Sequence, residues 1–236
     1  MVRNGSKLKS LAISLLNTRT ERDEQKKVGA SQISNPCTKH LALALAGYQE
    51  EPSKYWLGGK VGTAVHAALE EGIAKSGYEG DLQGAVVEQK IILGEIDGYG
   101  TVSSKPDLVL PRIKHLVDWK TSTRAKTKKI QQWVDGVKQD ASTTYTMQKY
   151  IGQTQLYAWG LNNSGIEVEN ISLVFINRDG TSDSDVLEYT FEYDESIAVA
   201  LWQRLVVLWE ELQNGVHPES YAGHPECFNC SVNGLV

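Results

Sequence analysis

The chain has few cysteines and no long apolar run. Three cysteines among 236 residues are too few for a disulfide framework, and their odd number points to free thiols or metal ligands. No uninterrupted apolar stretch is long enough to span a bilayer, and the polar start lacks the apolar segment of a secretory signal. We therefore expect a cytoplasmic protein that has no membrane partner.

Positive charge is also scarce, because 24 Lys and Arg stand against 29 Asp and Glu, for a formal net charge of −5. Taken over the whole chain, this balance argues against a nucleic-acid partner. The distribution is uneven, however: residues 105–129 hold eight Lys or Arg against two Asp, whereas residues 181–236 hold one Arg against ten acids. The local charge of each segment, and not the net charge, therefore indicates what it binds.

The composition that remains is typical of one globular domain. With 41% hydrophobic and 22% charged residues, the chain is long enough to bury a sizeable core. The first thirty residues have few large apolar side chains after Leu16 and are rich in Lys and Arg. We expect a basic N-terminal arm over residues 1–30 and a single domain over residues 31–236.

Periodicity and turn residues predict alternating helices and strands. Helices are expected over residues 36–47, 63–74, 148–161 and 196–215. Strands are expected over residues 85–93, 105–110, 113–122, 171–178 and 186–193. This order predicts an α/β domain with a mixed central β-sheet flanked by helices.

Two acids and a lysine carry the strongest chemical signal. In a strand over residues 113–122, the period of two places Asp118 and Lys120 on one face, and a paired strand brings Asp107 to the same point. Two converging carboxylates repel each other unless a divalent cation lies between them, and oxygen ligands suit Mg²⁺ or Mn²⁺. A neighbouring lysine can activate or orient a water, so the arrangement predicts metal-assisted phosphodiester hydrolysis.

An isolated D-x-K triplet is usually a set of solvated side chains at a strand end. Two further groups of residues favour an active site over this interpretation. His66 and Glu70 share one face of an expected helix, where the imidazole supplies a metal ligand and Glu70 an outer or additional one. Tyr150, Gln153 and Tyr157 share a face of a later helix. They form either an aromatic seam on the sheet or a support for the lysine or a DNA phosphate.

Four motifs in a fixed order make a family resemblance. They are G-x-x-x-H-x-x-L-E at residues 62–70, P-D at 106–107, D-x-K at 118–120 and Y-x-x-Q-x-x-x-Y at 150–157. In this order they resemble the PD-(D/E)xK nucleases, and in particular the RecB-like branch with the CRISPR-associated RecB-like exonucleases and related phage exonucleases. The resemblance extends over residues 31–230 and implies a restriction-endonuclease-like core.

The resemblance also implies roles for individual residues. They are the Mg²⁺ or Mn²⁺ ligands His66, Asp107 and Asp118, the catalytic lysine Lys120, and the helix-motif residues Gln153 and Tyr157. Glu88 and Asp97, in the strands before Pro106, are set below these residues, because an acid in a hairpin is usually solvated.

The cysteines lie on either side of these motifs, with Cys37 before them and Cys227 and Cys230 after them. In the resembling family, one cysteine before the core and three after it bind a [4Fe-4S] cluster that joins the chain ends. The fourth cysteine has no counterpart here, and His40 or His224 would complete the site. We expect a [4Fe-4S] cluster, while a Zn²⁺ site or no metal at all stays open.

A basic run directly follows the expected catalytic lysine. Its members are Arg124, Lys126, Lys128 and Lys129. Such a run forms either a solvated loop or a contact with the DNA backbone, and its position beside the proposed site favours the backbone contact.

Together these signals predict a Mg²⁺- or Mn²⁺-dependent deoxyribonuclease that hydrolyses phosphodiester bonds at DNA ends. The resemblance implies phage or prokaryotic DNA recombination or processing, in the host cytoplasm if the chain is phage-encoded. Two alternatives stay open: a non-catalytic subunit that binds DNA ends, and a DNA endonuclease of the same fold. Because Val61 follows Gly58-Gly59-Lys60, no phosphate loop is present, so a helicase or recombination protein would be a separate partner.

Overall fold

A mixed five-stranded sheet lies at the centre of the fold. The structure is a computed structural model that describes residues 27–48, 56–77 and 79–232. The strand order is β1-β4-β5-β6-β7, in which β5 and β6 are parallel and the other neighbours are antiparallel. These strands are β1 (Val86–Val87), β4 (Leu108–Leu110), β5 (His115–Ser122), β6 (Asn170–Asn177) and β7 (Val186–Glu192). A separate antiparallel hairpin consists of β2 (Ile91–Ile96) and β3 (Gly100–Ser104).

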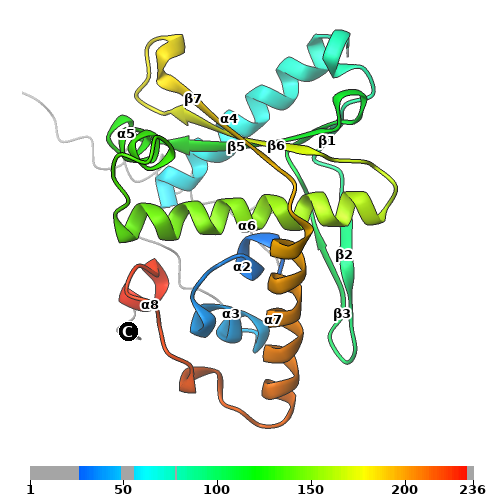
Figure 1. Cartoon of the computed structure of the whole chain (residues 1–236), viewed down its shortest axis with the longest axis vertical. Coiled ribbons are helices and arrows are strands. Elements are labelled where there is room, and N and C mark those ends of the chain that lie inside the picture. Colours follow the sequence, from blue (N-terminus) through cyan, green and yellow to red (C-terminus); the bar gives the residue numbers. More distant parts are fainter. Residues whose placement is uncertain (1–26, 49–55, 78, 233–236) are drawn as a thin grey trace, which may run out of the picture.

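Helices cover both faces of this sheet. They are α2 (Ala30–Ile33), α3 (Thr38–Leu45), α4 (Trp56–Lys75), α5 (Arg124–Val134), α6 (Ala141–Asn163), α7 (Glu195–Gln213) and α8 (Phe228–Val232). Short 3-10 turns are η2 (Gly80–Leu82), η3 (Pro111–Ile113), η4 (Asp183–Asp185) and η5 (Pro218–Ser220). Figure 1 shows α6 crossing the molecule between the sheet on one side and α2, α3 and α7 on the other.

The alternation of β5 explains how the two helical layers are held. Leu116 packs in a core cluster that includes Leu156 of α6. Its neighbour Val117 points to the opposite face and packs in a cluster that includes Ile73 of α4. The prediction of a mixed α/β domain with a helix-flanked sheet is confirmed at this level.

The predicted strand over residues 85–93 is wrong in its extent, because the structure has two separate strands, β1 and β2, in this part of the chain. Glu88 has a positive φ of 49° and separates β1, which pairs with β4, from β2, which pairs with β3. The hairpin partner β3 is absent from the sequence prediction, and a tight turn with positive φ at Gly98 and Gly100 leads into it.

Several helices also differ from the sequence prediction; α6, for example, begins at Ala141 and not at residue 148. The basic run after Lys120 is not a loop but the first part of α5, whose N-cap Thr123 accepts a hydrogen bond from the backbone of Lys126. The buried residues Thr127 and Ile130 lie three apart, and the charged residues around them mask this short apolar stripe in the sequence. Helix α4 begins at Trp56, before the predicted start at residue 63, although it contains three glycines in its first two turns.

The predicted N-terminal arm lies mostly outside the described residues, which begin at Lys27. The end of the arm packs against β3 and the turn before it: Val28 donates its backbone N–H to Tyr99 Oη, and Ala30 donates to Ser104 Oγ. Within the described part of the chain, we find no helix with the length and apolar character needed to span a bilayer.

Candidate active site

Helix α4 lies close to β5 because it presents a glycine to the strand. A Cβ atom at Gly62 would lie only 3.1 Å from Thr121 Oγ1, which is tighter than an ordinary contact. His66 follows one turn later on the same face of the helix, and its Nε2 lies 3.1 Å from the carbonyl oxygen of Trp119. The four-residue spacing of Gly62 and His66 therefore brings the imidazole against β5, the central strand of the sheet.

The second ring nitrogen of His66 faces an acid. Its Nδ1 lies 3.3 Å from Asp107 Oδ1, while Asp107 Oδ2 accepts a hydrogen bond of 2.7 Å from the backbone N–H of Trp119. The contact with Asp107 raises the pKa of His66 above its ordinary value, and burial opposes this rise only in part. Because a carbonyl only accepts, Nε2 carries a proton, and the neutral ring then offers Nδ1 to a cation.

Glu88 joins this pair. Ligand atoms of His66, Glu88 and Asp107 lie within 4.8 Å of one another. The antiparallel pairing of β1 with β4 explains the position, since the backbone N–H of Glu88 donates to the carbonyl of Asp107 across the two strands. One imidazole nitrogen and two carboxylates are a donor set that fits Mg²⁺ or Mn²⁺.

The sequence pattern places Glu88 below the other candidates, whereas the structure brings its carboxylate into the group with His66 and Asp107. Its left-handed backbone is unusual for a residue with a side chain, and such conformations persist where the surroundings impose them, often at functional sites. No periodicity signals this turn, so only the tertiary arrangement identifies the residue.

Asp118 and Lys120 form a buried ion pair on one face of β5, as the strand alternation predicts. Lys120 Nζ lies 2.6 Å from Asp118 Oδ2, and the Asp118 side chain is 1% exposed. Burial raises the pKa of Asp118 to about 6, and the lysine opposes this rise. Burial by itself would lower the pKa of Lys120, but the carboxylates and tyrosines around it, Asp118 first, raise that pKa above its ordinary value. Asp118 therefore holds the lysine in its charged form.

Helix α6 supports the same lysine from the other side. Lys120 Nζ donates to Gln153 Oε1 at 3.3 Å, and Gln153 Nε2 donates to Tyr157 Oη at 2.6 Å. The Tyr150 ring also lies 4.9 Å from Lys120 Nζ, a cation–π contact. The structure contains both interpretations of this helix face, because Tyr150 and Tyr157 also pack in the core against the sheet.

Three lysines of the basic run are exposed on α5, and one of them, Lys126, lies beside this site. Lys126, Lys128 and Lys129 are exposed, and α5 follows directly after β5. Lys126 Nζ lies 5.9 Å from the centre of the Tyr150 ring, the same ring that Lys120 contacts. The first turns of α5 therefore carry positive charge to the border of the site, where the helix dipole adds to it.

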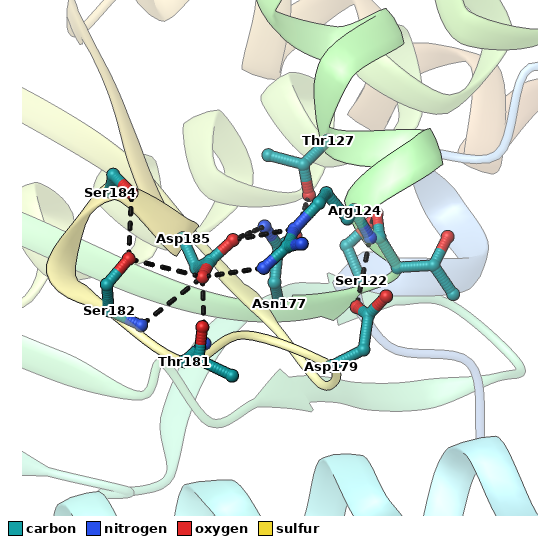
Figure 2. Close-up of polar contacts among 10 residues, drawn as sticks. Ser122, Arg124, Thr127, Asn177, Asp179, Thr181, Ser182, Ser184 and Asp185 are labelled. Carbon is teal, nitrogen blue, oxygen red and sulfur yellow. Dashed lines mark hydrogen bonds and ion pairs between the residues drawn. The ribbon is translucent and has the colours of Figure 1, made fainter.

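Arg124 differs from these lysines because its guanidinium binds within the protein. Its Nε and Nη2 donate to the two carboxylate oxygens of Asp185, each at 2.9 Å, and its backbone N–H donates to Asp179 (Figure 2). Asp185 also accepts from the backbone of Thr181 and from Asn177 at the end of β6. These bonds, that from Thr181 first, lower the pKa of Asp185 to about 2. Arg124 thus attaches α5 to the β6–β7 connection.

The structure leaves two further acids away from the metal-ligand group. Asp97 lies in the β2–β3 turn, where its carbonyl accepts a hydrogen bond from Trp209 Nε1. Glu70 lies one turn after His66 in α4. Among the described residues, neither belongs to the group of ligand atoms around His66.

The three cysteines come together at a separate place. Cys37, Cys227 and Cys230 are buried, and their sulfurs lie within 4.8 Å of one another. His40 hydrogen-bonds Cys227, whereas the ring of His224 packs against Tyr145. The turn before α3 and the start of α8 are therefore adjacent, as the sequence resemblance implies.

Comparisons with known proteins bear on the fold. No protein-family model and no curated protein sequence matches the chain. Among solved structures, an alkaline exonuclease from Laribacter hongkongensis is similar, with 17% identity, a TM-score of 0.53 and coverage of 83% of this chain and 93% of that chain. The same exonuclease in complex with dAMP has 17% identity and a TM-score of 0.50, covering 80% and 89%. A phage-related exonuclease from Haemophilus somnus has 15% identity and a TM-score of 0.46, covering 80% and 95%.

At such low identity, the likeness to the Laribacter exonuclease is a likeness of fold. It covers most of both chains. The chain thus shares its fold with an alkaline exonuclease, consistent with the RecB-like branch of the PD-(D/E)xK nuclease superfamily that its motifs resemble.

Proposed function

We propose that the chain is a metal-dependent deoxyribonuclease that hydrolyses phosphodiester bonds at DNA ends. One observation carries the proposal: the metal-ligand group of His66, Glu88 and Asp107 lies beside a buried lysine held by Asp118. A ligand group and a charged donor at one point are what hydrolysis of a phosphodiester requires.

The ligand roles follow from the contacts of each residue. Trp119 orients His66 through Nε2, so that Nδ1 and the carboxylates of Glu88 and Asp107 would hold Mg²⁺ or Mn²⁺. A bound ion would polarise the scissile phosphate and lower the pKa of a water. Asp118 lies outside this group of ligand atoms, and its main contact is the ion pair with Lys120. The resemblance implies that Asp118 is also a metal ligand, and we keep this role as a proposal.

Lys120 acts as a fixed donor. Asp118 and Gln153 bind its ammonium group from two sides, so the group keeps one orientation. A charged ammonium in that position donates a hydrogen bond to the attacking water or to a phosphate oxygen, and it offsets the charge that builds up there. Tyr157 fixes the amide of Gln153 and thereby supports the lysine indirectly.

The substrate class follows from the charge around the site. The lysines of α5, Lys126, Lys128 and Lys129, contact the DNA backbone in our proposal, and such contacts do not depend on sequence. We assign Arg124 a different role from the one expected from the sequence, because Asp185 already neutralises its charge. The shared fold with an alkaline exonuclease supports an action at DNA ends.

The biological setting follows from the same resemblance. We propose DNA recombination or processing in a phage or prokaryote, in the cytoplasm, beside a separate helicase or recombination protein. The Gly58-Gly59-Lys60 segment supports a separate motor, because it is helical within α4 and does not form a phosphate-binding loop.

The decisive experiment is digestion of end-labelled linear DNA and of closed circular DNA, with Mn²⁺ or Mg²⁺ at low salt. An exonuclease releases label from the linear DNA, leaves the circle intact and stops when the ion is chelated. Nicking of the circle would instead indicate an endonuclease. Binding to ends without any cleavage would indicate the non-catalytic adaptor, and the enzyme proposal would fail.

A further inference from the structure

The cysteine cluster consists of two similar four-residue turns. In the first, the backbone N–H of His40 bonds Cys37 Sγ, and in the second, the backbone N–H of Cys230 bonds Cys227 Sγ. In a turn of this kind, the side chains of the first and fourth residues lie on the same side. His40 therefore has the place in the first turn that Cys230 has in the second.

The distances between the sulfurs fit a single ion. Cys37 Sγ and Cys230 Sγ lie 3.4 Å apart, and all three sulfurs lie within 4.8 Å of one another. A tetrahedral zinc ion with Zn–S bonds of about 2.3 Å holds its sulfurs about 3.8 Å apart. A four-iron cluster binds each thiolate through a different iron and needs the sulfurs further apart, so the closely packed thiols do not fit it.

Neither His40 nor His224 belongs to the group of ligand atoms that the three sulfurs form, and His40 is the better placed of the two to move into the fourth position. The imidazole of His40 is buried and hydrogen-bonds Cys227, and its Nδ1 lies 3.3 Å from the side-chain amide of Asn229. Rotating this amide by 180° turns its oxygen to His40, so that Nδ1–H donates to Asn229 and Nε2 is left for a metal. In contrast, His224 Nδ1 accepts a hydrogen bond from the backbone of Glu226.

The surroundings hold the first turn in place and supply a compensating charge. Asn35 Oδ1 accepts bonds from the backbone of Cys37 and from Tyr145 Oη. The buried Arg204 of α7 donates to the carbonyls of Ile33 and Asn35, and its charge interacts with Cys37. Three thiolates and one divalent ion leave one net negative charge, which a single guanidinium balances.

We propose that this cluster binds one Zn²⁺ in a closed tetrahedral site, in place of the iron–sulfur cluster that the sequence resemblance implies. The ligands are Cys37, His40, Cys227 and Cys230. The site is structural, because all four positions are filled by protein and no position is open to substrate. It joins the start of α3 to α8, and the binding free energy contributes directly to folding.

The primary test is the metal content of the full chain. The protein is produced with iron and zinc both available, purified without oxygen or chelators, and measured for zinc, iron, sulfide and visible absorption. We expect one zinc per chain, no iron and a colourless sample. Four irons with sulfide would overturn the proposal. A metal-free protein that also fails to take up one zinc on titration would overturn it as well.

A second test assigns the fourth ligand. His40→Ala should lose stoichiometric zinc, His40→Cys should retain it, and His224→Ala should behave as the wild type. Asn229→Ala should weaken zinc binding by about 10- to 100-fold in competition with a chelator, since it removes only the partner of the imidazole. Loss of zinc from His224→Ala but not from His40→Ala would overturn the assignment. These readouts do not use DNA cleavage, so they stand apart from the proposed nuclease activity.

Discussion

The candidate active site and the cysteine cluster are assembled in different ways. The active site consists of the metal-ligand group and the Asp118–Lys120 ion pair, and the cluster consists of the three cysteines. Asp107 directly precedes β4 and Lys120 lies on the neighbouring strand β5, only 13 residues later, whereas Cys37 and Cys230 meet across 193 residues. The first site stays partly open, since the His66 side chain is 23% exposed, while the cysteines are buried completely.

This difference indicates that the first site serves catalysis and the second serves stability. An open site built of oxygen and nitrogen donors leaves room for a water and a phosphate. A closed site built of sulfur donors excludes both and only holds segments together. Changes in the first site should therefore affect cleavage, and changes in the second should affect folding. The following predictions test that separation.

The largest effect is expected for Lys120→Ala. Removing this donor should lower the cleavage rate by at least about 100-fold, because the charge on the phosphate is no longer offset. Affinity for DNA should stay near the wild-type value, as measured by fluorescence anisotropy in Ca²⁺. Lys75→Ala, a change of an exposed lysine at the far end of α4, provides the control and should cleave normally. Cleavage by Lys120→Ala at the wild-type rate would refute the catalytic assignment.

The reverse pattern is expected for Cys227→Ser. If loss of the metal costs about 4 kcal/mol, the melting temperature should fall by roughly 8–16 °C. Molecules that stay folded at low temperature should still cleave DNA. Asp107→Asn is the matched opposite, with lost cleavage and a nearly unchanged melting temperature. A Cys227→Ser protein that melts like the wild type would show that the cluster does not stabilise the fold.

A smaller effect is expected for Glu88→Gln. This change keeps the size of the side chain but removes a charged ligand, so half-maximal cleavage should need about 10- to 100-fold more Mg²⁺. Asp97→Asn, which changes the other acid named as a weaker candidate in the sequence, should leave the metal dependence unchanged because Asp97 lies in the β2–β3 turn. Equal metal dependence of the two variants would remove Glu88 from the site.

The lysines of α5 should contribute to binding and not to chemistry. Replacing Lys126, Lys128 and Lys129 together by alanine should lower the salt dependence of DNA binding, by about 0.9 units of log–log slope for each phosphate that is no longer neutralised. The maximal rate with saturating DNA should change little. An unchanged slope would place the DNA backbone elsewhere on the surface.

The smallest effect is expected for the Arg124–Asp185 ion pair, which belongs to neither site. The pKa of Asp185 is about 2 in the folded protein and lies below the ordinary value of 3.8. Its contribution to the free energy of unfolding is therefore present above about pH 4 and is lost as the pH falls toward 2. Urea unfolding at several pH values should show this loss in the wild type and not in Asp185→Asn. Asp183→Asn, at an exposed position of the same connection, should unfold as the wild type does.

Some features were predictable because they depend on local spacing. The period of two in β5 places Asp118 and Lys120 on one face, and the four-residue interval in α6 places Gln153 beside Tyr157. The hairpin of β4 and β5 follows from the turn between them, and it brings Asp107 to the backbone of Trp119.

Other features depended on parts of the chain that are distant in sequence. Glu88 enters the site only because β1 pairs with β4, and Arg124 is neutralised only because Asp185, 61 residues later, lies beside it. In the same way, only packing shows that His40 contacts Cys227 while the ring of His224 lies against Tyr145.

By itself, the sequence determined the type of domain, the motifs and the residues that share one face of a strand or helix. Those features follow from backbone periods that each segment carries within itself. The tertiary structure alone decided which acid completes the ligand group, which basic residue is already paired and how close the sulfurs lie. These depend on register and packing between distant segments, which no local pattern encodes.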